Sequence, residues 1–106
     1  MVHLLPLPGA PLFNNNFSEL ISRAVSEAKI LEDTGFSAVL VENYGDVPFA
    51  KDAIDEQTFQ AMDEVLKKIR GSVNLPVGVN VLRNDSLSAM KLAEQNNCRF
   101  IRVNVL

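Results

Sequence analysis

The chain has 106 residues, 47% of them hydrophobic, and a formal net charge of −3 at pH 7. This length suits one domain, or part of one, that buries a modest core. Because the sequence has no basic stripe to attract phosphates, it predicts a protein that does not bind nucleic acid.

Cysteine content and the first residues indicate the compartment. The one cysteine, Cys98, cannot form a disulfide within the chain, and a reducing compartment accounts for it most simply. Residues 1–11 carry no basic leader, and two prolines interrupt an apolar run too short for a signal peptide or a membrane helix. We therefore expect a cytoplasmic protein with no membrane partner.

The first part of the chain alternates strand and helix patterns. Residues 2–7 form a short apolar run that predicts a first strand. Asn16 and Glu19 have the spacing of a capping box, and the apolar face that follows predicts a helix that stops at Gly35. The β-branched and apolar residues 36–41 then predict a second strand.

The second part repeats this alternation. Apolar residues at helical spacing predict a helix over 56–70, with Gly71 ending it. Residues 77–82 predict a third strand, and Asp85 can cap the helix that follows. Residues 100–106 predict a fourth strand.

Strands that alternate with helices imply right-handed βαβ units and a parallel sheet, either doubly wound or closed into a barrel. Asn80, Arg102 and Asn104 alternate with valines and isoleucine along their strands, and Glu42 shares a face with Leu40. A doubly wound sheet favours apolar residues on both faces, whereas a barrel strand can turn polar on its inner side near the top. The pattern therefore favours an α/β fold, the (βα)3β4 half of a (β/α)8 barrel.

Four segments carry a family resemblance. The chain matches the strand-end motifs of the BtpA/SgcQ family, in order and spacing, at the segments HLLPLPGAP, VENYGDVPF, GVNVLRND and FIRVNV. The resemblance implies a TIM barrel. Some members of this family look like sugar or nucleoside catabolic enzymes, and its namesake is implicated in photosystem I assembly or stability in cyanobacteria. The family name alone does not predict that this chain contacts a photosystem.

The resemblance covers only the first half of such a barrel. We therefore expect residues 1–106 to be a single partial barrel domain and a fragment, without the phosphate-binding loops that usually follow strands seven and eight. Four strands with open edges leave backbone groups unpaired, so such a half barrel should dimerise, aggregate or lack activity. The expected partner is thus another copy or the missing second half.

The carboxyl ends of parallel barrel strands converge on one mouth, where catalytic groups of this fold sit. His3 can act there as a general acid or base or as a metal ligand; alternatively, it is a buried histidine bonded to a neighbouring strand. Glu42 and Asp46 can hold a divalent metal or divide acid and base roles, although Asp46 can equally fix a turn beside Gly45. No metal or other cofactor is identified by a specific motif.

Polar residues near the same strand ends predict substrate contacts. Asparagine amides suit sugar hydroxyls, and Arg102 can hold a carboxylate or phosphate with two hydrogen bonds. Alternatively, Arg102 pairs with Glu42 in an internal network, and Asp85 is better explained as a helix cap than as a catalyst. The predicted substrate-binding residues are Asn43, Asn80, Arg83, Asn84, Arg102 and Asn104.

Two functions from different classes fit these residues. The first is an enzyme-like barrel that acts on a small polar metabolite, such as a sugar, a nucleoside or a phosphorylated compound. No zinc motif, dinucleotide-binding glycine motif or nucleophile elbow is present. Because the serines and Cys98 also have no convincing partner, covalent catalysis is disfavoured. The second is a non-catalytic binding or assembly factor, since a fold does not establish turnover.

Overall fold

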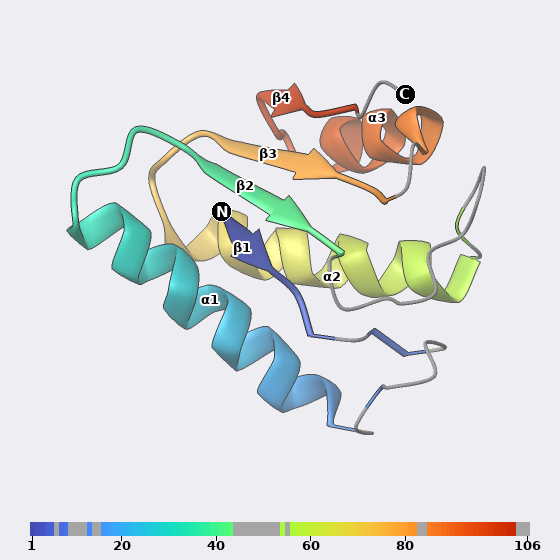
Figure 1. The fold of residues 1–106 in the computed structure, drawn as a ribbon, viewed down its shortest axis with the longest axis horizontal. Helices are drawn as coiled ribbons and strands as arrows, with labels where there is room; N and C mark the ends of the chain where they lie inside the picture. Colours follow the sequence, from blue (N-terminus) through green and yellow to red (C-terminus); the bar gives the residue numbers. More distant parts are fainter. Residues whose placement is uncertain are drawn as a thin grey trace.

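The computed structural model describes residues 1–5, 7–8, 13, 16–43, 54, 56–82 and 85–103. Strands and helices alternate along these residues, as the sequence predicts (Figure 1). The strands are β1 (Val2–His3), β2 (Val39–Glu42), β3 (Val77–Asn80) and β4 (Phe100–Ile101). The helices are α1 (Phe17–Asp33), α2 (Glu56–Ser72) and α3 (Ser86–Gln95).

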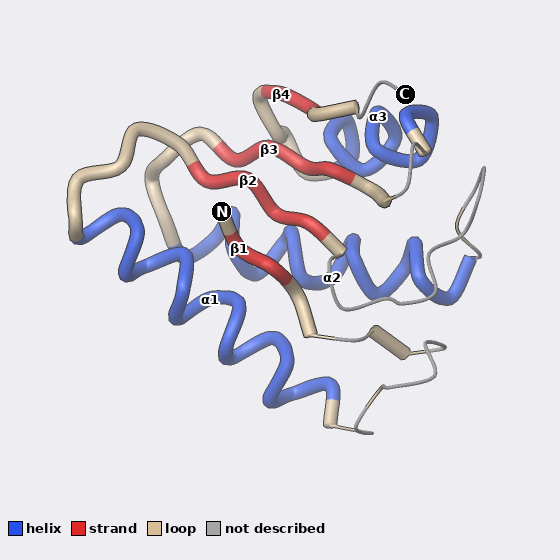
Figure 2. The backbone as a smooth tube through the Cα atoms, in the orientation of Figure 1, coloured by secondary structure: helices blue, strands red, loops and turns tan. Residues whose placement is uncertain are grey.

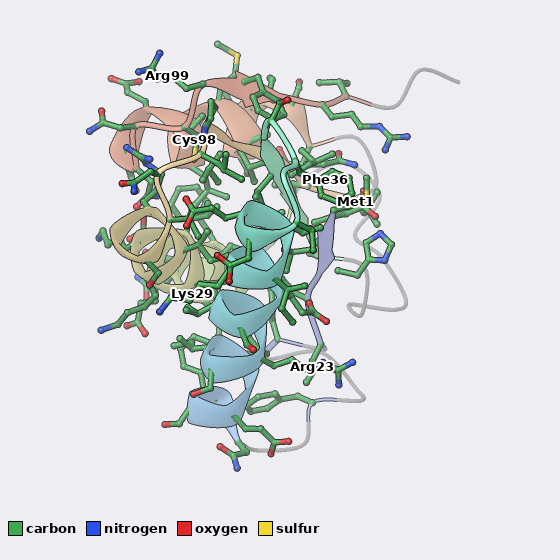
Figure 3. All side chains as sticks on the ribbon, turned by 90° about the vertical axis from the view of Figure 1, so that its left-hand side faces the viewer. Met1, Arg23, Lys29, Phe36, Cys98 and Arg99 are labelled. Carbon is green, nitrogen blue, oxygen red and sulfur yellow. The ribbon has the colours of Figure 1, made fainter. Side chains whose placement is uncertain are left out.

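The four strands form one parallel sheet in the order β1-β2-β3-β4 (Figure 2). Each strand therefore pairs with the next one along the chain, whereas the strand order of a doubly wound sheet reverses at a switch point. The three helices lie on one side of this sheet, as the views in Figures 1 and 3 show. The predicted fold class is thus confirmed: the arrangement is consistent with the first half of a (β/α)8 barrel.

The hydrophobic core lies between the sheet and the helices. Every second residue of the two central strands points into it, and these side chains are fully buried. The opposite face is more open, with His3 exposed and Leu40 half-buried. Core residues from the strands include Val39, Val41, Val77 and Val79, and those from the helices include Leu20, Ala24, Met62, Leu66, Ile69 and Leu92.

Three of the four predicted helix boundary signals are confirmed: the Asn16 cap and Gly35 at the two ends of α1, and the Asp85 cap of α3. Asn16 Oδ1 accepts a hydrogen bond from the Glu19 backbone N–H at 3.0 Å, and α1 starts one residue after this cap. Gly35 follows α1 with a φ of 92°, a left-handed conformation that glycine adopts without strain. Both signals stabilise the ends of α1 as expected.

The prediction that Gly71 ends α2 is wrong by one residue, because α2 continues to Ser72. Gly71 does not have the positive φ that Gly35 adopts, and the hydrogen bonding runs past it. The Ser72 hydroxyl donates to the Lys68 carbonyl at 2.7 Å, and the Val73 N–H donates to the Ile69 carbonyl at 3.1 Å. Side-chain and backbone donors thus satisfy carbonyls at this helix end.

The strands are shorter than the apolar runs that predicted them. β2 begins at Val39 rather than residue 36, because the Phe36 N–H still bonds to the Leu31 carbonyl at the end of α1. β4 covers Phe100–Ile101 only, with Arg102 and Val103 following outside the strand and 104–106 outside the described residues. None of the helices in the described part of the chain has the length and apolarity needed to cross a bilayer.

Candidate functional site

Three predicted site residues meet at the carboxyl ends of neighbouring strands. His3 is in register with Glu42 across β1 and β2, and Glu42 is in register with Asn80 across β2 and β3. Residues in register on adjacent parallel strands point to the same face, here the face opposite the helices. His3, Glu42 and Asn80 therefore form one row, which we call the polar row.

Glu42 is the centre of the polar row. Its carboxylate is buried, and Oε2 accepts a hydrogen bond from Asn80 Nδ2 at 2.7 Å. The other oxygen, Oε1, lies 3.7 Å from Nε2 of His3, an ion pair when the imidazole is protonated. The side chain of His3 is 47% exposed and that of Glu42 only 8%, so the histidine covers the carboxylate on the open side.

His3 has a second contact, with the residue that precedes β1. Nε2 of His3 lies 2.8 Å from the Sδ atom of Met1, two residues earlier. The alternative of a buried histidine does not apply, because the ring is exposed. An exposed imidazole beside a buried carboxylate is a familiar arrangement for proton transfer.

Asn43 has a different role in the geometry. Its side chain is buried, Oδ1 accepts from the Leu82 N–H at 2.6 Å, and Nδ2 donates to the Leu82 carbonyl at 3.4 Å. These two bonds continue the pairing of β2 with β3 after both strands have ended. Asn43 therefore holds the strand ends together, and its predicted substrate contact stays a prediction.

A row of apolar groups lies one step nearer the amino ends of the strands on the same face. Leu40 is in register with Gly78, and Gly78 with Phe100. A Cβ atom at position 78 would overlap the Phe100 ring, so glycine makes room for this aromatic side chain. Sequence reasoning missed this contact, although an isolated glycine within a strand signals a close approach.

Arg102 does not join the polar row through an ion pair. Its backbone N–H donates to the Val79 carbonyl at 3.1 Å, which places it beside Asn80, but its side chain is exposed. Among the ion pairs of the described residues, none links Arg102 to Glu42. Arg102 is thus an exposed cation beside Asn80, and its predicted substrate contact stays a prediction.

The other predicted site residues cannot be placed relative to the polar row. Asp46, Arg83, Asn84 and Asn104 lie outside the described residues.

Asp85 is the helix cap that the sequence favours: its carboxylate accepts from Ser88 N–H at 3.0 Å, from the Ser88 hydroxyl at 2.7 Å and from Ile54 N–H at 2.7 Å. These bonds give Asp85 a structural role as an acceptor.

Comparison with known proteins identifies the family. The sequence profile of the BtpA family matches residues 1–106. The chain belongs to the BtpA family. The resemblance deduced from the four strand-end motifs is thereby confirmed.

Relatives in the BtpA family are longer than this chain. Uncharacterised proteins of Thermococcus kodakarensis and Methanocaldococcus jannaschii are 53% and 49% identical to it over 106 residues, which is all of this chain and 40% of each relative. A Synechocystis protein named "Photosystem I biogenesis protein BtpA" is 42% identical over the whole chain and 37% of its own length. The chain thus spans about 40% of the length of these relatives. No solved structure matches the chain with significance.

The chemistry available to this BtpA-family site is that of a carboxylate, an imidazole and an amide. Across the residues that the structure describes, no group of three or more His, Cys, Asp or Glu side chains is placed to hold a metal ion. Burial raises the pKa of the Cys98 thiol from its usual value, an effect that the charge of Arg70 opposes, and a raised pKa disfavours the nucleophilic thiolate. General acid and base chemistry fits these groups better than nucleophilic catalysis by Cys98.

Proposed function

We propose that residues 1–106 form part of one BtpA-family barrel domain, which binds a small polar metabolite at the carboxyl ends of its strands. The observation that carries this proposal is the buried Glu42 carboxylate, held by Asn80 at 2.7 Å and facing His3 at 3.7 Å. A sugar, a nucleoside or a phosphorylated derivative supplies the hydroxyl groups that such a site can bind. Glu42 is its central acceptor.

The burial of Glu42 supports a role beyond structure. Removing a carboxylate from water costs several kcal/mol unless hydrogen bonds or opposite charges compensate. Asn80 is the one hydrogen-bond donor to this side chain within the described part of the protein. A ligand hydroxyl could donate to Oε1 beside His3, so the buried carboxylate is the acceptor on which the proposal rests.

The positions of Glu42 and His3 suggest different acid–base roles for the two side chains. The Glu42 carboxylate accepts a proton from a ligand hydroxyl, while the imidazole of His3, on the exposed side, exchanges protons between ligand and solvent. Asn80 keeps the carboxylate in place, and Arg102 binds a carboxylate or phosphate group of the ligand at the edge of the polar row. The substrate contacts predicted for Asn43, Arg83, Asn84 and Asn104, and the catalytic role predicted for Asp46, stay predictions.

A thermal-shift screen tests this function. The protein for the screen is a full-length hybrid, in which residues 1–106 of this chain replace the matching segment of the Methanocaldococcus jannaschii relative. It is screened against sugars, nucleosides, sugar phosphates and, separately, Mg²⁺ and Mn²⁺. A ligand at 100 times its Kd stabilises the folded state by about 2.7 kcal/mol, which raises the Tm by roughly 5–10 °C for a protein of this size.

The variants decide where the ligand binds. Glu42→Gln and Arg102→Ala should abolish most of this Tm increase for the identified ligand. Glu64→Gln is the matched control, because Glu64 is exposed on α2 and the same charge is removed far from the polar row. If the ligand raises the Tm of the Glu42→Gln variant as much as it raises the Tm of the Glu64→Gln variant, Glu42 is not part of the binding site.

An assembly factor is the second candidate function. It is favoured by the Synechocystis relative, which is 42% identical over the whole chain and is named for photosystem I biogenesis. This reading predicts that no small molecule raises the Tm of the full-length hybrid, and that the hybrid forms a stable complex with a defined membrane-protein assembly partner. Stabilisation by one metabolite that depends on Glu42 favours the first proposal instead.

A further inference from the structure

A polar hollow lies at the amino ends of the strands, at the opposite end of the sheet from the polar row. It forms where the end of α2, the connection to β3 and the residue before β4 meet. Pro76 at its edge and Asn80 in the polar row are joined by β3, a distance of about 13 Å along a strand. The hollow has a volume of about 280 Å³, and its lining consists of Arg70, Val73, Asn74, Leu75, Pro76 and Arg99.

Two guanidinium groups give this hollow a positive charge. Arg70 is half-buried near the end of α2, and Arg99 is exposed just before β4, on the side of the sheet that faces the viewer in Figure 3. Among the described residues, no carboxylate forms an ion pair with either side chain. Glu32 lies behind the lining and accepts the Asn74 N–H at 2.6 Å, so its carboxylate already has a donor. The hollow therefore offers two uncompensated cations.

Arg70 is held in place by a hydrogen bond that leaves its charge unpaired. Its Nε donates to the Asn96 carbonyl at 3.2 Å, and the buried Asn96 side chain is in turn fixed by a 2.8 Å bond to Asp63. Asp63 pairs with Lys67 at 2.7 Å rather than with Arg70. Within the described part of the chain, the bond to Asn96 is the only hydrogen bond of this guanidinium, so its terminal nitrogens remain donors. The orientation of Arg70 is thus fixed before any ligand binds.

A simpler role for Arg70 is to neutralise the partial negative charge at the carboxyl end of α2. The last carbonyls of this helix, however, already accept the Ser72 hydroxyl and the Val73 N–H. This role would also leave Arg99 unexplained, because Arg99 belongs to the connection between α3 and β4 and lines the same hollow. Two arginines from separate connections fit a shared ligand better than a helix-end effect.

We propose that the hollow between Arg70 and Arg99 is a second ligand site, which binds a phosphate group. A phosphate monoester carries about 1.5 to 2 negative charges at pH 7 and three strong acceptor oxygens, and the planar fork of arginine binds two such oxygens at once. The Asn74 side chain adds an amide donor to the lining. The volume of about 280 Å³ is just below the roughly 300–1,000 Å³ of sites that enclose a whole drug-sized ligand, so it suits a single small group. An inorganic phosphate ion and a phosphate monoester share this chemistry.

A phosphate titration of the full-length hybrid tests the proposal. The Tm is measured against phosphate concentration while NaCl keeps the ionic strength constant. At ten times the Kd, phosphate should raise the Tm by about 3–6 °C. Arg99→Gln should raise the phosphate concentration needed for half of this shift by at least about tenfold, because it removes charge-assisted hydrogen bonds to the ligand. Arg70→Gln should do the same, and if it lowers the Tm without phosphate, the exposed Arg99 still decides.

Arg23→Gln is the matched control for loss of a positive charge. Arg23 is exposed on α1, pairs with Glu27 at 3.6 Å and lies far from Arg99 in Figure 3, so this variant should keep the whole phosphate shift. A parallel titration with AMP identifies the source of the phosphate. An Arg99-dependent shift at lower concentrations of AMP than of phosphate indicates a monoester, and a shift at equal concentrations indicates the free ion.

Two results overturn the proposal. An equal shift in every variant shows that phosphate acts only as a general stabilising salt. A shift that survives Arg99→Gln but is lost in Arg102→Ala places the phosphate at the polar row, which leaves the proposed function intact and removes the second site.

Discussion

Glu42 shows how a single residue position links the sheet to chemistry. Its register with His3 on one side and Asn80 on the other places a carboxylate between an imidazole and an amide. The neighbouring residues Val41 and Val79 point the other way and are fully buried, which fixes the direction of the polar row. The hydrophobic core thus determines which side chains reach the candidate site.

Asn80→Ala tests the hydrogen bond at the centre of the polar row. The substitution removes the Nδ2 donor that lies 2.7 Å from Glu42 Oε2 and leaves a buried carboxylate with fewer partners. We expect a loss of about 2 kcal/mol in the free energy of unfolding, measured by urea denaturation. Asn74→Ala, at an exposed position, should cost less than about 0.5 kcal/mol. Combining Asn80→Ala with Glu42→Gln should cost less than the sum of the two single changes, and strict additivity would argue against the bond.

The sequence predicted part of the site because strand periodicity carries direct information. Alternation of polar and apolar residues placed Glu42 and Asn80 on one face, and the structure has them there. It could not predict that Asn43 bonds the Leu82 backbone, because the direction of a side chain after a strand end depends on tertiary packing. The close approach of Phe100 to Gly78 depends on the register of two strands, which periodicity does not fix.

At the scale of elements, the helix starts are specified by single acceptor residues. Asn16 and Asp85 both accept the backbone N–H three residues ahead, as the sequence patterns predicted. The strand lengths were overestimated, since an apolar run continues into buried loop residues outside the strand ladder: Val81 and Leu82 are buried beyond the end of β3. Capping chemistry is local and readable from sequence, whereas strand ends depend on the neighbouring strand.

The Asp85 side chain caps α3 and also accepts a hydrogen bond from the Ile54 N–H just before α2. Asp85→Ala removes all three bonds, so the free energy of unfolding should fall by about 2–3 kcal/mol. Asp85→Asn keeps an acceptor for Ser88 N–H but has one acceptor oxygen fewer, and it should recover about half of the loss. The measurement is chemical denaturation followed by circular dichroism. Equal losses for both variants would show that the bond to Ile54 dominates.

At the scale of the whole molecule, the sheet has one covered and one open face. Helices bury the valine side, while the polar row and the row of Leu40, Gly78 and Phe100 occupy the other. In a closed barrel this second face is the interior, filled by layers of side chains below a mouth where ligands bind. Phe100, 38% exposed here, would then lie in the floor of the proposed binding site.

Gly78→Ala distinguishes an open face from a closed one. The new Cβ overlaps the Phe100 ring. Because this ring can move outward in residues 1–106 alone, the free energy of unfolding of that chain should change by less than about 1 kcal/mol. In the full-length hybrid the ring cannot move outward, so Gly78→Ala should lower the free energy of unfolding by about 1–3 kcal/mol. Gly71→Ala is the control: it meets open space in α2 and should stabilise both proteins by up to about 1 kcal/mol. Equal effects of Gly78→Ala in both proteins would mean that the face stays open.

An experimental structure of the full-length hybrid tests the central claim most directly. It should show β1 to β4 as neighbours within a closed parallel barrel, with the Glu42 carboxylate bonded to Asn80 and facing the enclosed interior beside His3. A structure in which Glu42 and Asn80 point outward, or lie on separate surfaces, would contradict the account.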